Sequence, residues 1–378
     1  MSDCTVYVMD ISYFSGKFEA YLRYKEIPYR RVDVSHRQLY EVYLRTGTMK
    51  VPAVELPDGR WLKDTTPMIR WFEEQHQAHP VIPSDPVLRF IANLIEDYAD
   101  EWLWRPAMWW RWMPRGSRVN LGRRIADEIL GDFPGPAFLK AIYFGWRQRR
   151  TWLWGDGMTR DNSAQIRDMY PQQLAALEQI FSERPFLFGE QPGIADYGYF
   201  ASMFRHFGND PDSSIVMRQT APGVHAWLAR MWNARASAFS EPPQWSLPEG
   251  EGMNFILRDI CSVYLPYLHQ NACAFRDGQR RFDFSAGGLQ LPGTHTTDYR
   301  VWCRQDLQRQ LAGLSDADRD RVVALLQPHG GVAALLADGE IDSGLDDELK
   351  IPFKARPPAS AWHRARVWLF GNPRQARA

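Results

Sequence analysis

Residues 50–72 read KVPAVELPDGRWLKDTTPMIRWF, and their pattern predicts a strand, a turn, a second strand and then a helix. Side chains at 51–56 alternate between apolar and polar as in a strand, and residues 57–59, Pro-Asp-Gly, have the composition of a tight turn. Thr65 followed by Pro67 marks the start of the helix. We therefore expect a short antiparallel hairpin that leads directly into a helix.

Two positions in this stretch have chemistry beyond that of a hairpin. Pro52 opens the first strand, where neighbouring backbone groups would otherwise pair. Asp64 and Thr65 lie at the amino terminus of the helix, where unpaired N–H groups and the positive end of the helix dipole favour a carboxylate. Each motif alone is typical of an ordinary hairpin or helix cap, but their combination at this spacing indicates a ligand site.

Val51-Pro52 followed by Asp64-Thr65 resembles the glutathione-binding half of the glutathione transferase superfamily, in which the second pair is usually Glu-Ser or Asp-Ser. In that thioredoxin-like fold, a cis peptide bond before the proline turns the N–H and C=O of the preceding residue toward a peptide ligand. The resemblance implies that Val51 holds the cysteinyl backbone of glutathione and that Asp64 with Thr65 binds its γ-glutamyl group. Lys50 would then be a partner for the glycyl carboxylate.

The composition sets limits on size and partners. A chain of 378 residues has room for two or three domains, and its formal net charge is zero. This balance argues against nucleic acid as a partner, because proteins that bind phosphates concentrate Lys and Arg. Cys4, Cys261, Cys273 and Cys303 show no Cys-x-x-Cys spacing and no zinc-type His companions, so we expect neither a disulfide framework nor a metal site.

The sequence predicts a cytoplasmic protein without a membrane partner. The apolar run at residues 5–9 is too short for a signal peptide, and no run of about eighteen apolar residues occurs. The content of aromatic residues is high, with 16 Trp, 15 Tyr and 20 Phe. It predicts either an apolar cleft or an unusually aromatic core.

The first eighty residues have the pattern of an α/β domain. The expected elements before the hairpin are strand, helix, strand and helix, at residues 4–10, 17–26, 29–34 and 37–45. Together with the hairpin and its helix, this order is the thioredoxin-like arrangement of the transferases. We place a glutathione-binding domain at residues 1–80, because the prolines between 80 and 86 indicate a linker.

The loop at residues 11–17 lies where the transferases carry the side chain that activates the glutathione thiol. A hydroxyl that donates to the sulfur favours the thiolate, and each unit by which the thiol pKa falls corresponds to roughly 1.4 kcal/mol. Ser12 fits the serine-type pattern Ser-x-x-Ser-x-Lys best. Tyr13 is the first alternative, as in the tyrosine-type classes, and Ser15 is the second. Ser12 is also a typical helix cap.

From residue 86 to about 240 the pattern becomes helical, and the resemblance implies an all-helical domain with an insertion at about 113–165. The acidic residues between 96 and 101 are expected to form a solvated face or to pair with Arg105 and Arg111, rather than to act in catalysis. The Trp- and Arg-rich segment at 102–112 is expected either to pack between helices or to line an apolar substrate pocket.

Residues 186–197 resemble the transferase sequence in which a Thr or Ser begins a buried helix and an Asp three residues later returns the hydrogen bond. Gly193 stands where the Thr or Ser is usual. Asp196 is therefore left to accept from the Gly193 backbone amide, and we interpret this motif as structural.

The resemblance covers residues 4 to about 236. We expect residues 245–378 to form a mainly helical carboxy-terminal extension of unknown role, with helices near 252–274 and 299–314 and a strand near 282–288. The final run, 357–378, is expected to be a peripheral end.

The resemblance implies an enzyme that uses glutathione as co-substrate. Its thiolate would attack an apolar small-molecule electrophile by addition, substitution or reductive cleavage, and the sequence does not choose among these. A homodimer is also implied. The alternative is a non-catalytic module that binds a ligand or a protein through the aromatic segment and the extension.

Overall fold

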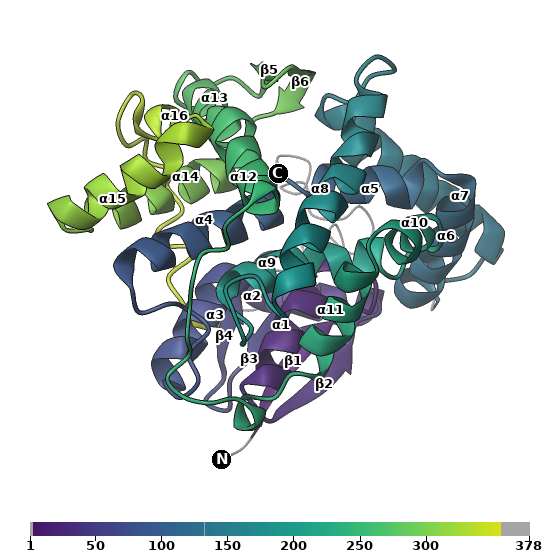
Figure 1. Cartoon of the computed structure of the whole chain (residues 1–378). Helices are drawn as coiled ribbons and strands as arrows, with labels where there is room; N and C mark the ends of the chain where they lie inside the picture. Colours follow the sequence, from purple (N-terminus) through teal and green to yellow (C-terminus); the bar gives the residue numbers. More distant parts are fainter. Residues whose placement is uncertain (1–2, 132, 357–378) are drawn as a thin grey trace.

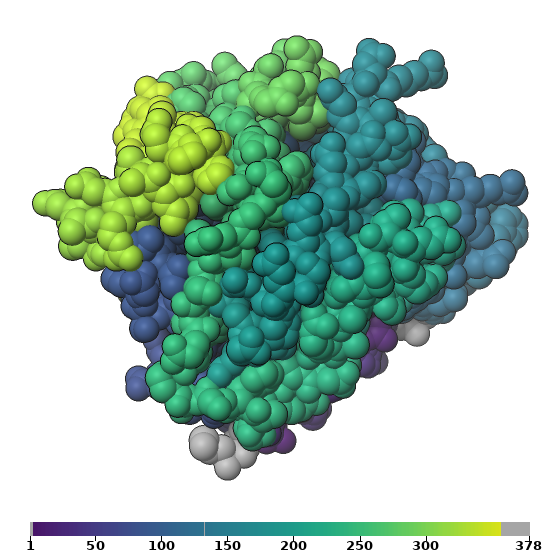
Figure 2. All heavy atoms as spheres, viewed as in Figure 1, coloured from purple at the N-terminus to yellow at the C-terminus, as the bar shows by residue number. Residues whose placement is uncertain are grey.

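The computed structural model describes residues 3–131 and 133–356 (Figure 1). The amino-terminal sheet lies at one end of the molecule, and the helices of the remaining chain are stacked above it. In Figure 2 the extension, green to yellow, lies directly against the teal and blue helical domain. Buried apolar side chains form one main core that continues from the first strand into the extension.

The amino-terminal domain has the predicted thioredoxin-like order. Strand β1 pairs in parallel with β2 and antiparallel with β3, and β3 pairs antiparallel with β4. Val6 and Val8 of β1 are fully buried, as expected for a central strand. The elements are β1 (Cys4–Val8), α1 (Tyr13–Tyr24), β2 (Tyr29–Asp33), α2 (His36–Thr46), β3 (Ala53–Glu55), β4 (Arg60–Lys63) and α3 (Thr65–Gln75).

The helical domain follows, and its first helix begins where the sequence indicates. Asp85 caps that helix by accepting from the Leu88 N–H at 2.8 Å, and Pro86 occupies the first helical position. Its helices, apart from those between α5 and α8, are α4 (Pro86–Glu101), α5 (Trp104–Trp112), α8 (Ser163–Glu183), α9 (Ile194–Ser202), η3 (Met203–Phe207), α10 (Pro211–Thr220), α11 (Pro222–Asn233) and η4 (Ala236–Ala238).

The cap of α9 confirms the structural interpretation of Asp196. Its carboxylate accepts from the N–H groups of Gly193 at 3.0 Å and Leu187 at 2.9 Å, and from Trp227 Nε1 at 3.0 Å. One buried acidic group thus joins the start of α9 to α11 and to the loop before α9.

Between α5 and α8 the chain forms a helical hairpin in the region predicted to be an insertion. It consists of α6 (Arg115–Leu130) and α7 (Ala137–Gln148), followed by the short turns η1 (Arg149–Leu153) and η2 (Trp154–Asp156). Gly122 allows the two helices to approach closely, because a Cβ there would lie 3.0 Å from the Ala141 carbonyl oxygen.

The extension is mainly helical, as predicted. Its helices and hairpin are α12 (Glu251–Asp259), η5 (Ile260–Tyr264), α13 (Leu265–Arg276), β5 (Arg281–Ala286), β6 (Leu289–His295), α14 (Asp298–Ala312), α15 (Asp316–Leu326), η6 (Gln327–His329) and α16 (Ala333–Leu336). Helix α12 packs on α8, and α14 and α15 pack on α4. Within the described ranges no helix is both long and apolar enough to cross a bilayer.

The extension ends on the amino-terminal sheet, which the sequence did not predict. Strand β7 (Phe353–Lys354) pairs antiparallel with β4, with Phe353 opposite Trp61 and Lys354 opposite Arg60. The sheet order is therefore β2-β1-β3-β4-β7. This pairing covers the backbone groups of β4 at what would otherwise be an open edge of the sheet. The expected peripheral end, 357–378, lies outside the described residues.

Candidate functional site

The candidate hydroxyl Ser12 is the cap of α1. Its Oγ accepts from the Ser15 N–H at 3.3 Å and donates to the Val51 carbonyl at 3.4 Å. The loop is also fixed from the helical domain, since Arg111 Nη1 donates to the Ile11 carbonyl at 2.9 Å. Ser12 therefore has the cap role that the sequence indicates, and the structure also places its hydroxyl beside the backbone of residue 51.

The two alternative hydroxyls are committed to other contacts. The Tyr13 hydroxyl is buried and donates to the Ala99 carbonyl at 2.6 Å, and burial together with the Asp100 carboxylate raises the pKa of Tyr13 well above its usual range. Ser15 is fully buried and its Oγ accepts from the Met9 N–H at 3.3 Å. Of the three hydroxyls, Ser12 alone is partly accessible.

The acidic residue before α3 has an unusual backbone. Asp64 has φ of +72°, in a region that side chains other than glycine rarely occupy. Such strain is concentrated at ligand-binding sites, where the surrounding structure maintains it. The carboxylate does not cap its own helix. Its Oδ1 instead accepts from the Tyr299 hydroxyl at 2.9 Å.

Tyr299 brings the extension into the site. It lies in the first turn of α14, and its ring centroid is 5.9 Å from Lys50 Nζ, so that one phenol contacts two of the predicted ligand-binding residues. The Val51–Pro52 peptide bond is cis, as predicted. Thr65 is buried at the start of α3. Sequence reasoning missed Tyr299, because the extension has no motif that connects it with residue 64.

Burial raises the pKa of the Asp64 carboxyl above its ordinary value. The hydrogen bond from Tyr299 and the positive charges of Lys50 and Lys17 lower that pKa and so oppose the effect of burial. The site therefore combines a half-buried carboxylate, an ammonium group and a helix amino terminus. These are the groups that would bind the charged ends of a zwitterionic peptide.

A buried cation lies beneath the site. Lys17 Nζ is 2.5 Å from Glu96 Oε1 and also contacts Asp100, and the side chains of all three are almost completely buried. Thr66 of α3 donates to the same Glu96 oxygen at 2.6 Å. Burial opposes the charge of Lys17, but the two carboxylates outweigh it and raise the pKa of the lysine. These contacts join α1, α3 and α4.

This arrangement corrects the prediction for the acidic residues between 96 and 101. They do not form a solvated face, and their partners are not Arg105 and Arg111. Arg105 pairs instead with Asp156 at 3.1 Å, and Arg111 with Asp210 at 2.6 Å. The charge pattern correctly indicated that these carboxylates need partners. Those partners come from α1 and α14, where Lys17 and Arg300 lie.

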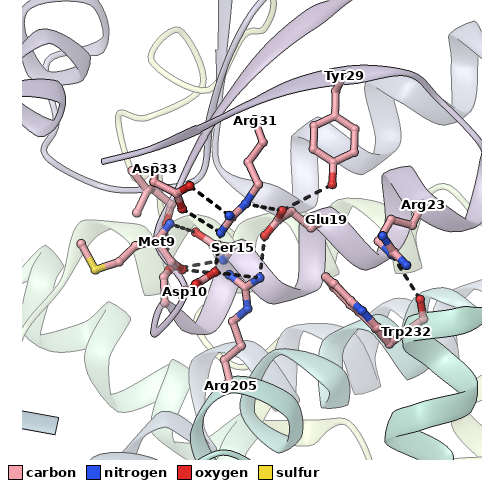
Figure 3. A network of polar contacts seen from close by, with 12 residues as sticks. Met9, Asp10, Ser15, Glu19, Arg23, Tyr29, Arg31, Asp33, Arg205 and Trp232 are labelled. Carbon is pink, nitrogen blue, oxygen red and sulfur yellow. Dashed lines mark hydrogen bonds and ion pairs between the residues drawn. The ribbon is translucent and has the colours of Figure 1, made fainter. Parts of the chain in front are cut away.

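A second ionic network holds the loop from its other side (Figure 3). Arg205 of η3 donates to the Met9 carbonyl at 2.8 Å and pairs with Glu19 at 2.6 Å, and Glu19 also pairs with Arg31 at 2.9 Å. Gly16 allows this approach, because a Cβ there would lie 2.9 Å from Arg205 Cδ. The loop is therefore positioned by both the sheet and the helical domain.

The aromatic segment serves mainly in packing. Trp102 and Trp112 are fully buried, while Trp109 Nε1 donates to Ser163 Oγ at 2.8 Å. The hollow beside the loop has a volume of about 290 Å³. It is lined by Met9, Asp10, Asp33, Val34, Ser35 and Glu128. A larger hollow of about 550 Å³ lies along α6, away from the candidate site.

Comparison with known proteins agrees with this architecture. Residues 6–80 match the family model of the glutathione S-transferase N-terminal domain, and residues 160–230 match that of the C-terminal domain. A thioredoxin-like domain followed by a helical domain of this kind defines the class. Over residues 6–80 and 160–230 the chain therefore carries both domains of the glutathione transferase superfamily.

Several solved structures are similar in fold. A GST-like protein from Pseudomonas syringae is 18% identical with a TM-score of 0.44, covering 66% of this chain and 78% of that chain. The β-etherase LigF from Sphingobium sp. strain SYK-6 is 19% identical with a TM-score of 0.43, covering 61% and 95%. FzlA from C. crescentus is 15% identical with a TM-score of 0.40, covering 67% and 98%. Similarity at this level carries no argument about activity.

Proposed function

We propose that the chain is a glutathione transferase-like enzyme in which the Ser12 hydroxyl activates the thiol of bound glutathione. The observation that supports this most is the position of Ser12. It is the accessible member of three loop hydroxyls, and its Oγ lies 3.4 Å from the carbonyl of Val51. A thiol held by the backbone of residue 51 would lie within reach of that hydroxyl.

The charged groups around the site fit glutathione. Asp64 would pair with the γ-glutamyl ammonium, and the start of α3 at Thr65 would receive the γ-glutamyl carboxylate. Lys50 would receive the glycyl carboxylate. Of the two carboxylate oxygens of Asp64, Oδ1 accepts the hydrogen bond from Tyr299. Within residues 3–131 and 133–356 no hydrogen bond to Oδ2 is found, so this oxygen is available for the ammonium.

Thiol activation follows from hydrogen bonding. A free thiol has a pKa near ~8.5, and a hydroxyl that donates to the sulfur stabilises the anion and lowers that pKa. The thiolate would then form a bond to an electrophilic carbon. In a substitution the leaving group departs with its electron pair, and in an addition the neighbouring atom takes up a proton. That the electrophile is apolar rests on the family resemblance.

Titration of bound glutathione tests the role of Ser12. With the wild-type chain, thiolate absorbance should rise at a pH about one to two units lower than for free glutathione, because a hydrogen bond to a charged group contributes roughly 1.5–3 kcal/mol. Ser12→Ala should return the titration toward that of free glutathione while the peptide stays bound. Tyr13→Phe and Ser15→Ala are the matched controls. An unchanged titration in Ser12→Ala would refute the assignment.

A non-catalytic module is the second candidate, and the Tyr299–Asp64 hydrogen bond is the observation that favours it. In that case the phenol occupies the position of the γ-glutamyl group. The enzyme proposal predicts that immobilised glutathione retains the wild-type chain and that Asp64→Ala weakens binding by roughly 1.5–3 kcal/mol. The second candidate predicts no retention of the wild type, and a gain of retention in Tyr299→Ala.

We also propose a homodimer in the cytoplasm, and a division into domains at residues 1–80, 86–240 and 245–378. The first two points rest on the resemblance and on the sequence. The domain division also comes from the sequence. In the structure, the segment between the helical domain and the extension is held against the helical domain, because the Ser246 N–H donates to the Phe188 carbonyl at 2.9 Å. Light scattering would measure the mass of the assembly.

A further inference from the structure

Three side chains that bind transition metals meet in the extension, far along the chain from the glutathione site. His269 and Cys273 lie one turn apart on α13, and Asp338 lies in the turn after α16. The Cys273 Sγ is 3.8 Å from either ring nitrogen of His269 and 3.4 Å from Asp338 Oδ2. His269 Nε2 is 3.5 Å from the same carboxylate oxygen.

These separations match the edges of a tetrahedral zinc site. Zinc lies about 2.3 Å from a thiolate sulfur and about 2.0–2.2 Å from imidazole nitrogen and carboxylate oxygen. Tetrahedral angles then place the ligand atoms roughly 3.3–3.6 Å from one another. The observed distances from Cys273 Sγ to His269 and to Asp338, and from His269 Nε2 to Asp338, differ from these values by a few tenths of an ångström.

The turn that carries Asp338 is held in place before any ion binds. Its φ of +57° is unusual for a residue other than glycine. Arg304, which is 1% exposed, donates to the carbonyls on both sides, to Ala337 and, at 3.0 Å, to Gly339. Gln308 donates to the Gly339 carbonyl at 2.9 Å. A buried cation and an amide thus fix the backbone that presents the carboxylate, as supporting residues do around metal ligands.

We propose that His269, Cys273 and Asp338 bind a divalent transition metal ion, zinc by the chemistry of the ligands. A thiolate and a carboxylate supply two negative charges, which balance the ion, and the neutral imidazole is the third ligand. Three protein ligands leave the fourth position for water or an outside ligand. Arg276 lies 3.8 Å from Asp338 Oδ1, and the ion would bind the other oxygen of this carboxylate, Oδ2.

The ligand form of a cysteine is the thiolate. Binding of the ion to Cys273 would therefore release the thiol proton to solvent.

The sequence did not predict this site. The interval of four residues between His269 and Cys273 is a helical ligand spacing, and it was the only signal that could have been recognised. Asp338 follows 65 positions later and reaches the pair only through the packing of α16 against α13. The proposal departs from the prediction of no metal site.

Cobalt(II) titration of the metal-free full-length chain tests the site. Tetrahedral cobalt with a thiolate ligand gives visible d–d bands and a charge-transfer band in the near ultraviolet, and zinc added afterwards should abolish both. We expect these bands in the wild type, with roughly one proton released per ion at neutral pH. Cys273→Ala should lose the charge-transfer band, and His269→Gln should weaken binding at least about tenfold.

The exposed His225 on α11 provides the matched control, so His225→Ala should bind cobalt as the wild type does. Zinc should also protect Cys273 from alkylation, a readout that needs no variant. The proposal is overturned if the wild type gives no tetrahedral spectrum. It is equally overturned if Cys273→Ala keeps the charge-transfer band, or if zinc leaves alkylation of Cys273 unchanged.

Discussion

Helix α4 presents one acidic pair to the thioredoxin-like domain and another to the extension, and the two are neutralised differently. On the first face, Glu96 and Asp100 lie four residues apart and share the ammonium of Lys17. All three side chains are removed from water. An ion pair of this kind is costly to break, because removal of one partner leaves uncompensated charge in the interior.

The second face has a mixed set of partners. Asp97 accepts from the Tyr264 hydroxyl at 2.6 Å, and Glu101 lies 3.5 Å from Arg300. Asp97 thus pairs with a neutral hydroxyl, whereas the acidic residues on the other face pair with the ammonium of Lys17. The difference shows that acidic residues at the same spacing can form a seam between domains that is held by a buried cation or one that is held by a neutral hydroxyl.

Lys17→Met should have the largest effect of the changes that test this comparison. It leaves Glu96 and Asp100 buried without a cation, and we expect the free energy of unfolding to fall by about 3–5 kcal/mol in urea denaturation. Lys350→Met, at an exposed lysine, is the control. Restoring stability with Glu96→Gln and Asp100→Asn in the same chain would show that unpaired charge is the cause. A loss below about 1 kcal/mol would contradict the comparison.

The face toward the extension should respond to pH. Burial raises the pKa of Asp97 to about 8, whereas an unfolded aspartate titrates near ~3.9. The native state therefore holds this proton more tightly, and its contribution to stability is complete below about pH 4 and is lost as pH rises through 8.

Asp97→Asn stays neutral, so it should remove that loss. The difference in free energy of unfolding between variant and wild type should shift in favour of the variant by about 4 kcal/mol between pH 5 and pH 9, because the native carboxyl loses its proton about three pH units above the start of that range, at roughly 1.4 kcal/mol per unit. Urea midpoints at the two pH values measure the shift. Parallel pH profiles for the two proteins would show that Asp97 is ionised throughout.

The smallest effect is expected where the extension contacts α3 near solvent. Arg70 and Asp306 form a two-pronged ion pair at 2.8 and 3.0 Å, but their side chains are 30% and 22% exposed. Solvent screening should limit the coupling energy to about 1 kcal/mol or less. A double-mutant cycle of Arg70→Ala and Asp306→Ala measures it. A coupling energy above about 2 kcal/mol would show that this contact behaves like the buried ion pairs of Lys17 and not like an exposed one.

The sequence predicted what is encoded over short distances. The hairpin that leads into α3, the cap at Asp196 and the helices of the extension all depend on residues a few positions apart. The contacts of Tyr299 with Asp64 and of Lys17 with Glu96 join residues 235 and 79 positions apart. Such pairings depend on how whole elements pack, and no local pattern records them. The role of Ser12 stays a prediction for a different reason, because it depends on a bound ligand.

The pairing of β4 with β7 also affects how the protein is made. The two strands lie almost 300 residues apart, and translation proceeds at roughly 5–20 residues per second. The ribosome therefore needs about 15–60 seconds after the synthesis of β4 to reach β7, the last strand of the amino-terminal sheet. During that interval β4 is an open edge on which another chain could add, so the nascent protein is exposed to edge-to-edge association until its carboxy-terminal segment arrives.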